Sequence, residues 1–104
     1  MAAEPVRLLL IQSWVIQTDR IRARLTAAGF TARITRVDFE AALDAACWRR
    51  DFDAVIVNTA TPGLPLAFVE ARLKELGVGV PLVELGDLDT LGARLRHALA
   101  ALRN

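Results

Sequence analysis

Short apolar segments alternate with segments of helical spacing along the whole chain, and this alternation limits the fold more than any other feature. Residues 7–11, 54–57 and 80–85 are continuous or nearly continuous apolar runs, which is typical of strands covered on both faces. Residues 31–37 instead alternate apolar and polar side chains, the pattern of a half-exposed edge strand. The sequence therefore predicts a sheet whose second strand lies at an edge.

Each strand is followed by a segment whose apolar residues share one face of a helix. Ser13 and Asp38 are positioned to cap the first two helices, and Gly29 and Gly77 to end the first and third. The expected apolar stripes are Ile21, Leu25 and Ala28; Phe39, Leu43, Ala46 and Cys47; Leu66, Val69, Leu73 and Leu76; and Leu91, Leu95, Leu99 and Leu102. Strict alternation predicts parallel strands joined by right-handed crossovers, with helices on both faces of the sheet.

One domain should span residues 1–104, because single cores commonly contain about 100 to 150 residues and nothing in the sequence marks a break. The 13 basic and 12 acidic residues are scattered without a run of one sign, so nucleic acid is not expected as a partner. An apolar content of 54% is high for a domain in water and predicts a surface that is normally covered.

Two features indicate the cellular compartment of the protein. The N-terminal apolar run, Leu8–Ile11, is far too short for a signal peptide or a membrane span, so we expect neither secretion nor membrane insertion. Cys47 is the only cysteine, which excludes an intrachain disulfide and a thiolate metal cage and fits a reducing cytoplasm. We expect Cys47 to be a buried structural thiol, and His97, the only histidine, to lie at the surface.

Polar residues stand where the predicted strands end, and functional groups of such sheets collect at the carboxyl ends of the strands. These residues are Gln12, Ser13, Asn58, Thr59 and Gly86. Two interpretations of Gln12 and Asn58 remain open: satisfied polar groups at the rim of the sheet, or groups that contact a partner. Trp14 is expected either to pack over this rim or to be a half-buried aromatic at the start of a helix.

The segments LLLIQS, AAGF, AVIVNTATPG and VPLVELG follow one another in the order found in the receiver domains of bacterial response regulators. The chain resembles this family over residues 6–103, and residues 33–57 look like receivers attached to sensory histidine kinases. The resemblance implies a flavodoxin-like, doubly wound α/β fold.

The same resemblance implies that the phosphorylation site is degenerate. Position by position, Gln12 and Ser13 replace the Mg²⁺-binding acid pair, Asn58 replaces the phospho-accepting aspartate, and Gly86 replaces the hydroxyl residue. The lysine of the family has no counterpart. An amide is not a usable nucleophile, and a Gln–Ser pair gives Mg²⁺ no charge to bind. We therefore expect no enzymatic activity, no metal and no cofactor.

Receivers continue after the fourth strand with a helix, a fifth strand and a last helix, whereas only one helix follows Gly86, and it resembles that last helix. This implies a sheet truncated to about four strands in order 2-1-3-4, without the fourth helix and the fifth strand. The fourth strand would then lie at an open edge, which makes Leu82, Glu84 and Leu88 the candidate interface. Val83 and Leu85 should point to the covered face.

These features predict a phosphorylation-independent interaction or dimerisation module of bacterial two-component-type signalling. Its partner would be a signalling protein, a fused kinase or output domain, or a second copy of the chain. The alternative is a receiver-like sensor that holds a small ligand above Gln12, Asn58 and Thr59. A catalytic phosphoreceiver with unusual ligands is disfavoured by the missing carboxylates.

Overall fold

Strands and helices alternate strictly through residues 5–101, the part of the chain that the computed structural model describes. The elements are β1 (Val6–Ile11), α1 (Val15–Ala27), β2 (Ala32–Val37), α2 (Glu40–Arg49), β3 (Ala54–Val57), α3 (Leu66–Glu75), β4 (Leu82–Glu84) and α4 (Leu88–Ala101). The predicted order of elements is therefore confirmed, although β4 is shorter than the predicted strand over residues 80–85.

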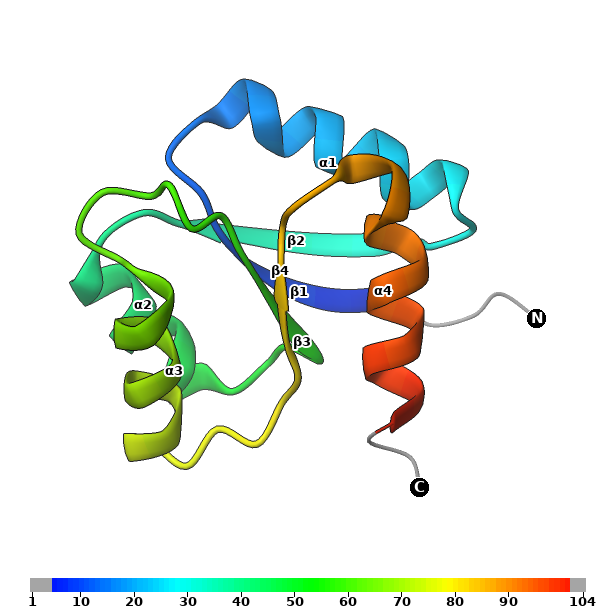
Figure 1. The fold of residues 1–104 in the computed structure, drawn as a ribbon. Coiled ribbons are helices and arrows are strands. Elements are labelled where there is room, and N and C mark those ends of the chain that lie inside the picture. The colour runs from blue at the N-terminus through cyan, green and yellow to red at the C-terminus, as the bar shows by residue number, and fades with distance from the viewer. Residues whose placement is uncertain (1–4, 102–104) are drawn as a thin grey trace.

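All strands of the sheet are parallel, and their order is β2-β1-β3-β4 (Figure 1). Ile11 is aligned with both Val37 and Val57, so the carboxyl ends of β1, β2 and β3 lie together. This arrangement confirms the predicted truncated, flavodoxin-like α/β fold.

Strand position follows the side-chain pattern of each segment. The residues of β3 are all buried, as are Leu8 to Ile11 of β1, because both strands are central and helices cover both their faces. In β2, half-buried and exposed residues alternate up to the buried Val37, which confirms the predicted edge strand.

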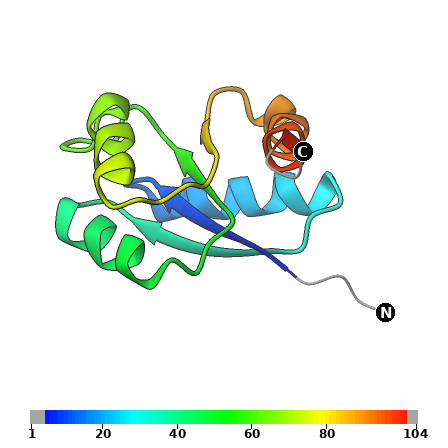
Figure 2. The same cartoon turned by 90° about the horizontal axis from the view of Figure 1, so that it is seen from below.

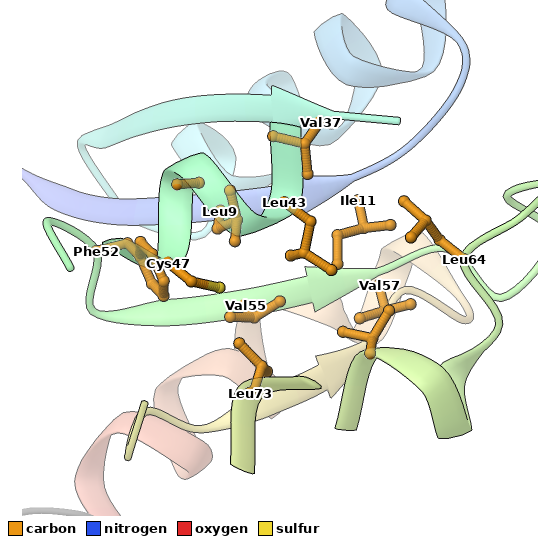
Figure 3. Packing of buried hydrophobic residues seen from close by; sticks show 12 residues of the cluster. Leu9, Ile11, Val37, Leu43, Cys47, Phe52, Val55, Val57, Leu64 and Leu73 are labelled. Atoms are coloured by element: carbon orange, nitrogen blue, oxygen red, sulfur yellow. The ribbon is translucent and has the colours of Figure 1, made fainter. Parts of the chain in front are cut away.

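The helices form one layer on each face of the sheet (Figures 1 and 2). The pair α1 and α4 covers one face, and the pair α2 and α3 covers the other. Leu8, Leu10, Ala54 and Ile56 point to α1 and α4, whereas the alternate residues Leu9, Ile11, Val55 and Val57 point to α2 and α3. Figure 3 shows the second group meeting Leu43 and Cys47 of α2 and Leu73 of α3.

The helix stripes are confirmed at most positions. Their central residues, Ile21, Leu25, Leu43, Ala46, Cys47, Val69, Leu73, Leu91 and Leu95, are buried. α1 and α3 end just before Gly29 and Gly77, as predicted. Leu102 lies outside the residues that the structure describes.

The predicted caps of the first two helices are wrong. The N-cap residues are Trp14 and Phe39, and neither makes a side-chain capping bond. The carboxylate of Asp38 instead pairs with Arg36 at 3.1 Å. Phe39 has an extended backbone and is 59% exposed, so it precedes the helix and does not join the buried stripe of α2.

Within residues 5–101, no helix has both the length and the apolar character needed to cross a membrane.

Candidate functional site

Gln12 and Asn58 meet at the carboxyl end of the sheet because β1 and β3 are adjacent parallel strands. Asn58 Nδ2 donates a hydrogen bond of 2.9 Å to Gln12 Oε1. Asn58 Oδ1 accepts a bond of 3.0 Å from the backbone N–H of Ala60, which shapes the loop that leads to α3. The rim polars singled out in the sequence therefore form one joint between two loops.

The Gln12 side chain lies inside the fold, since the residue is only 1% exposed. Its Oε1 also faces the backbone N–H of Trp14 at 3.4 Å, whereas its Nε2 has no hydrogen-bond partner among the described residues. No group of three or more His, Cys, Asp or Glu residues that could hold a metal ion occurs within residues 5–101. The centre of the site therefore consists of neutral amides, which hold one another in place.

Ser13 and Thr59 were also predicted to belong to this site, but their side chains do not take part in the Gln12–Asn58 joint. The backbone carbonyls of Gln12 and Ser13 accept bonds of 2.9 and 3.4 Å from Arg36 Nη1. Thr59 is exposed. The hydroxyl that binds the loop belongs to Thr61, which is buried and donates to the Asn58 carbonyl at 2.8 Å. Sequence reasoning missed Thr61, whose only signal is its position just before Pro62-Gly63.

The guanidinium group of Arg94 lies against Gly86. The φ angle of Gly86 is +50°, and a β-carbon placed on it would lie 3.3 Å from Arg94 Nη2. A side chain at this position would be strained and would crowd the guanidinium. In this chain, the Arg94 guanidinium therefore fills the space where receivers carry a hydroxyl side chain. Nothing in the sequence predicted this contact of Arg94.

The three residues of the predicted interface do not share one face. Leu82 packs at the margin of the α2 and α3 cluster, and Glu84 is exposed. Leu88 packs at the margin of the opposite cluster, beside α1 and α4. Val83 and Leu85 are buried, as expected. An interface made of Leu82, Glu84 and Leu88 remains a prediction.

The most exposed apolar segment lies at the start of α1. Trp14, Val15 and Ile16 are 70%, 59% and 73% exposed. Trp14 is therefore more exposed than either predicted position, over the rim of the sheet or half-buried at the start of the helix, would allow. These residues, with Ser13, Gln17 and Arg20, line an open pocket of about 540 Å³. We call Trp14, Val15, Ile16 and Arg20 the α1 patch. Its sequence signal was an uninterrupted apolar triplet at the start of a helix whose buried stripe begins later.

Two titratable groups with shifted pKa values lie on α2, on the face of the sheet opposite α1. Hydrogen bonds from Arg72 lower the pKa of Asp44. Burial, and to a smaller extent the charge of Asp44, raises the pKa of Cys47. Cys47 is buried and His97 is exposed, as predicted, and neither belongs to the Gln12–Asn58 joint.

No protein-family model matches this chain, and no curated protein matches it either.

Proposed function

We propose that the protein is a phosphorylation-independent interaction module that resembles a degenerate receiver domain. It would act in the cytoplasm in bacterial two-component-type signalling. Its partner would be a signalling protein, a fused kinase or output domain, or a second copy of the chain. The observation that carries this proposal is the exposure of the α1 patch, where three consecutive large apolar side chains face solvent.

Exposure of this kind favours protein recognition. Single exposed apolar residues are ordinary in proteins, but adjacent ones mark contact surfaces. Trp is also the residue type most enriched among binding hot spots. Arg20 adds a positive charge at the margin of the pocket, and the first turn of α1 contains no acidic residue. A partner that places an apolar side chain beside a carboxylate would complement this surface.

The neutral rim supports independence from phosphorylation. The Gln12–Asn58 bond replaces the carboxylates that acyl-phosphate chemistry and Mg²⁺ binding require. The closed position at Gly86 leaves no place for a hydroxyl. The domain would therefore present one constant surface to its partner.

Light scattering over a wide range of protein concentrations tests the proposal first. If the parent chain dimerises, we expect Ile16→Ser to dissociate the dimer, whereas Leu82→Lys would do so if the predicted β4 interface is used. Trp48→Ala is the matched control, because Trp48 is 77% exposed but lies on α2.

If the parent is monomeric, the immobilised domain should capture a bacterial protein with and without acetyl phosphate, and Ile16→Ser should abolish capture while Trp48→Ala should not. Equal capture by the parent and by both Ile16→Ser and Leu82→Lys, or capture that requires acetyl phosphate, would contradict the proposal.

A further inference from the structure

β4 is the last strand of the sheet, and its outer backbone groups face away from β3. Val55 N–H donates to the Pro81 carbonyl at 2.9 Å, and Leu85 N–H donates to the Val57 carbonyl at 2.8 Å. Residues in a strand alternate in the direction of their backbone groups. Leu82 and Glu84 therefore direct their N–H and C=O groups outward, where another strand could pair with them.

Arg94 of α4 reaches around to this edge. Its Nη1 donates to the Glu84 carbonyl at 2.5 Å, which is one of the outward groups. Its Nη2 donates to the carbonyls of Leu85 and Asp87 at 2.6 and 2.9 Å. Its Nε donates to Thr90 Oγ1 at 3.0 Å, which fixes the plane of the guanidinium. One side chain thus binds three backbone carbonyls at and just after the end of β4.

We propose that Arg94 closes the β4 edge and prevents two copies of the chain from pairing along it. The occupant it excludes is the β4 strand of a second copy. In an antiparallel pair related by a two-fold axis, Leu82 of each copy would exchange both backbone hydrogen bonds with Glu84 of the other. The carbonyl of Glu84 is needed for half of those bonds, and Arg94 already occupies it.

The rest of the edge would otherwise suit such a pair. Leu82 would lie opposite Glu84 of the second copy, so the two Glu84 carboxylates would not be directly opposed. The N–H and C=O of Leu82 and the N–H of Glu84 also point outward, and no side chain within residues 5–101 hydrogen-bonds them. Closure therefore depends on one guanidinium, whose planar donors match several carbonyls at once.

This inference is independent of the α1 patch, and light scattering of variants tests it. A parent dimer that Leu82→Lys dissociates would contradict it, because the parent edge should be closed. With Arg94→Ala, we expect a weight-average mass that rises with protein concentration, up to twice the mass of the parent species. Arg96→Ala is the matched control. Arg96 also lies on α4 and donates to a backbone carbonyl, but that carbonyl belongs to Ala28, at the end of α1. This control should keep the mass of the parent at every concentration.

A second substitution shows whether the new association uses β4. Because the Glu84 N–H points outward, Glu84→Pro removes a donor from the edge without removing a bond to β3. The double variant Arg94→Ala, Glu84→Pro should return to the parent mass. An Arg94→Ala protein that keeps the parent mass, or a double variant that still associates, would overturn the proposal.

Arg94→Lys decides the matter if Arg94→Ala does not fold. Lysine keeps the positive charge, but a single ammonium group cannot hold the three carbonyls in the arrangement that the guanidinium does. We expect Arg94→Lys to associate more weakly than a protein with a fully open edge, but measurably at high protein concentration. A parent-like mass across the whole range would overturn the proposal here too.

Discussion

Asn58 donates its amide N–H to Gln12 Oε1 at 2.9 Å, across a sequence separation of 46 residues. The bond joins the loop after β1 to the loop after β3 at the edge where doubly wound sheets carry their functional groups. Two neutral amides need no counter-ion, whereas clustered carboxylates at the same positions would repel one another without a metal. The joint therefore holds the loops together in the absence of any ligand.

Loss of this joint should destabilise the fold. Asn58→Ala removes the bonds to Gln12 and to the N–H of Ala60, and we expect it to lower the free energy of unfolding by about 1–3 kcal/mol. Asn58→Asp should cost less, because rotation of the Gln12 amide would bring its unpartnered Nε2 to the new carboxylate. Urea unfolding of both variants measures the difference. An Asn58→Asp protein less stable than Asn58→Ala would show that the Gln12 amide cannot turn.

A carboxylate placed at position 58 should not make the protein a substrate for phosphorylation. Asn58→Asp supplies a nucleophile, but Gln12 and Ser13 still offer Mg²⁺ no carboxylate, and Arg94 still occupies the space at Gly86. After incubation with acetyl phosphate and Mg²⁺, intact-mass analysis should show only unmodified protein. A conventional receiver in the same tube serves as the positive control, and a phosphorylated Asn58→Asp product would contradict the prediction.

The fold could be predicted from the sequence because periodicity reports burial directly. The continuous apolar run of β3 is too short for a helix, which indicated a strand covered on both faces, and the alternation in β2 indicated an edge strand. The caps could not be predicted in the same way. Ser13 and Asp38 are suitable residues, but Arg36 binds both the Ser13 carbonyl and the Asp38 carboxylate, and such a contact depends on the assembled sheet.

The neutral polar residues of the site could be predicted, but the contact of Arg94 with Gly86 could not. Gln12 and Asn58 could be placed together because parallel strands align their carboxyl ends. Arg94 could not be placed, because its contacts depend on where α4 crosses β4. The exposure of Trp14 also escaped prediction, because both expected positions, over the rim or half-buried at the start of the helix, would have covered its ring.

The Asp44–Arg72 pair should make stability fall in acid. Arg72 binds both carboxylate oxygens of Asp44, at 2.7 and 2.6 Å, and these bonds lower the pKa of Asp44 in the folded state. Below about pH 4 the unfolded chain therefore binds a proton that the folded chain still excludes. The contribution of Asp44 is complete above that pH and is lost as the pH falls through the folded pKa.

Urea unfolding of Asp44→Asn against the parent, at neutral pH and at stepwise lower pH, measures this contribution. The variant should be less stable at neutral pH, and the gap should close in acid. Arg72→Gln should remove the same contribution, so the two substitutions together should cost less than the sum of their separate costs. A gap that is constant with pH would contradict the assignment.

The thiol of Cys47 should react slowly in the native protein. Burial raises its pKa, so the reactive thiolate is scarcer and less accessible than in the unfolded chain. A thiol reagent such as dithionitrobenzoate should label Cys47 at a rate that rises with added urea toward that of the unfolded chain. The raised pKa also means that stability should decline as pH rises above about 8.5, because the unfolded thiol ionises first. Rapid labelling without urea would show that the α2–α3 face opens locally.

Gly92 sets how closely α4 approaches α1. A β-carbon placed on Gly92 would lie only 2.5 Å from the β-carbon of Ala28, so one of the two segments would have to move. Although alanine favours helix over glycine, we expect Gly92→Ala to lower the free energy of unfolding by about 1–3 kcal/mol through overpacking.

Gly79→Ala is the matched control, because no atom lies within 4 Å of its added β-carbon and it should be neutral or slightly stabilising. Because α4 carries Arg94, a displaced α4 should also weaken the closure of the β4 edge. Gly92→Ala should therefore associate more than Gly79→Ala in light scattering. Equal stability of the two variants would mean that the α1–α4 contact has room to relax.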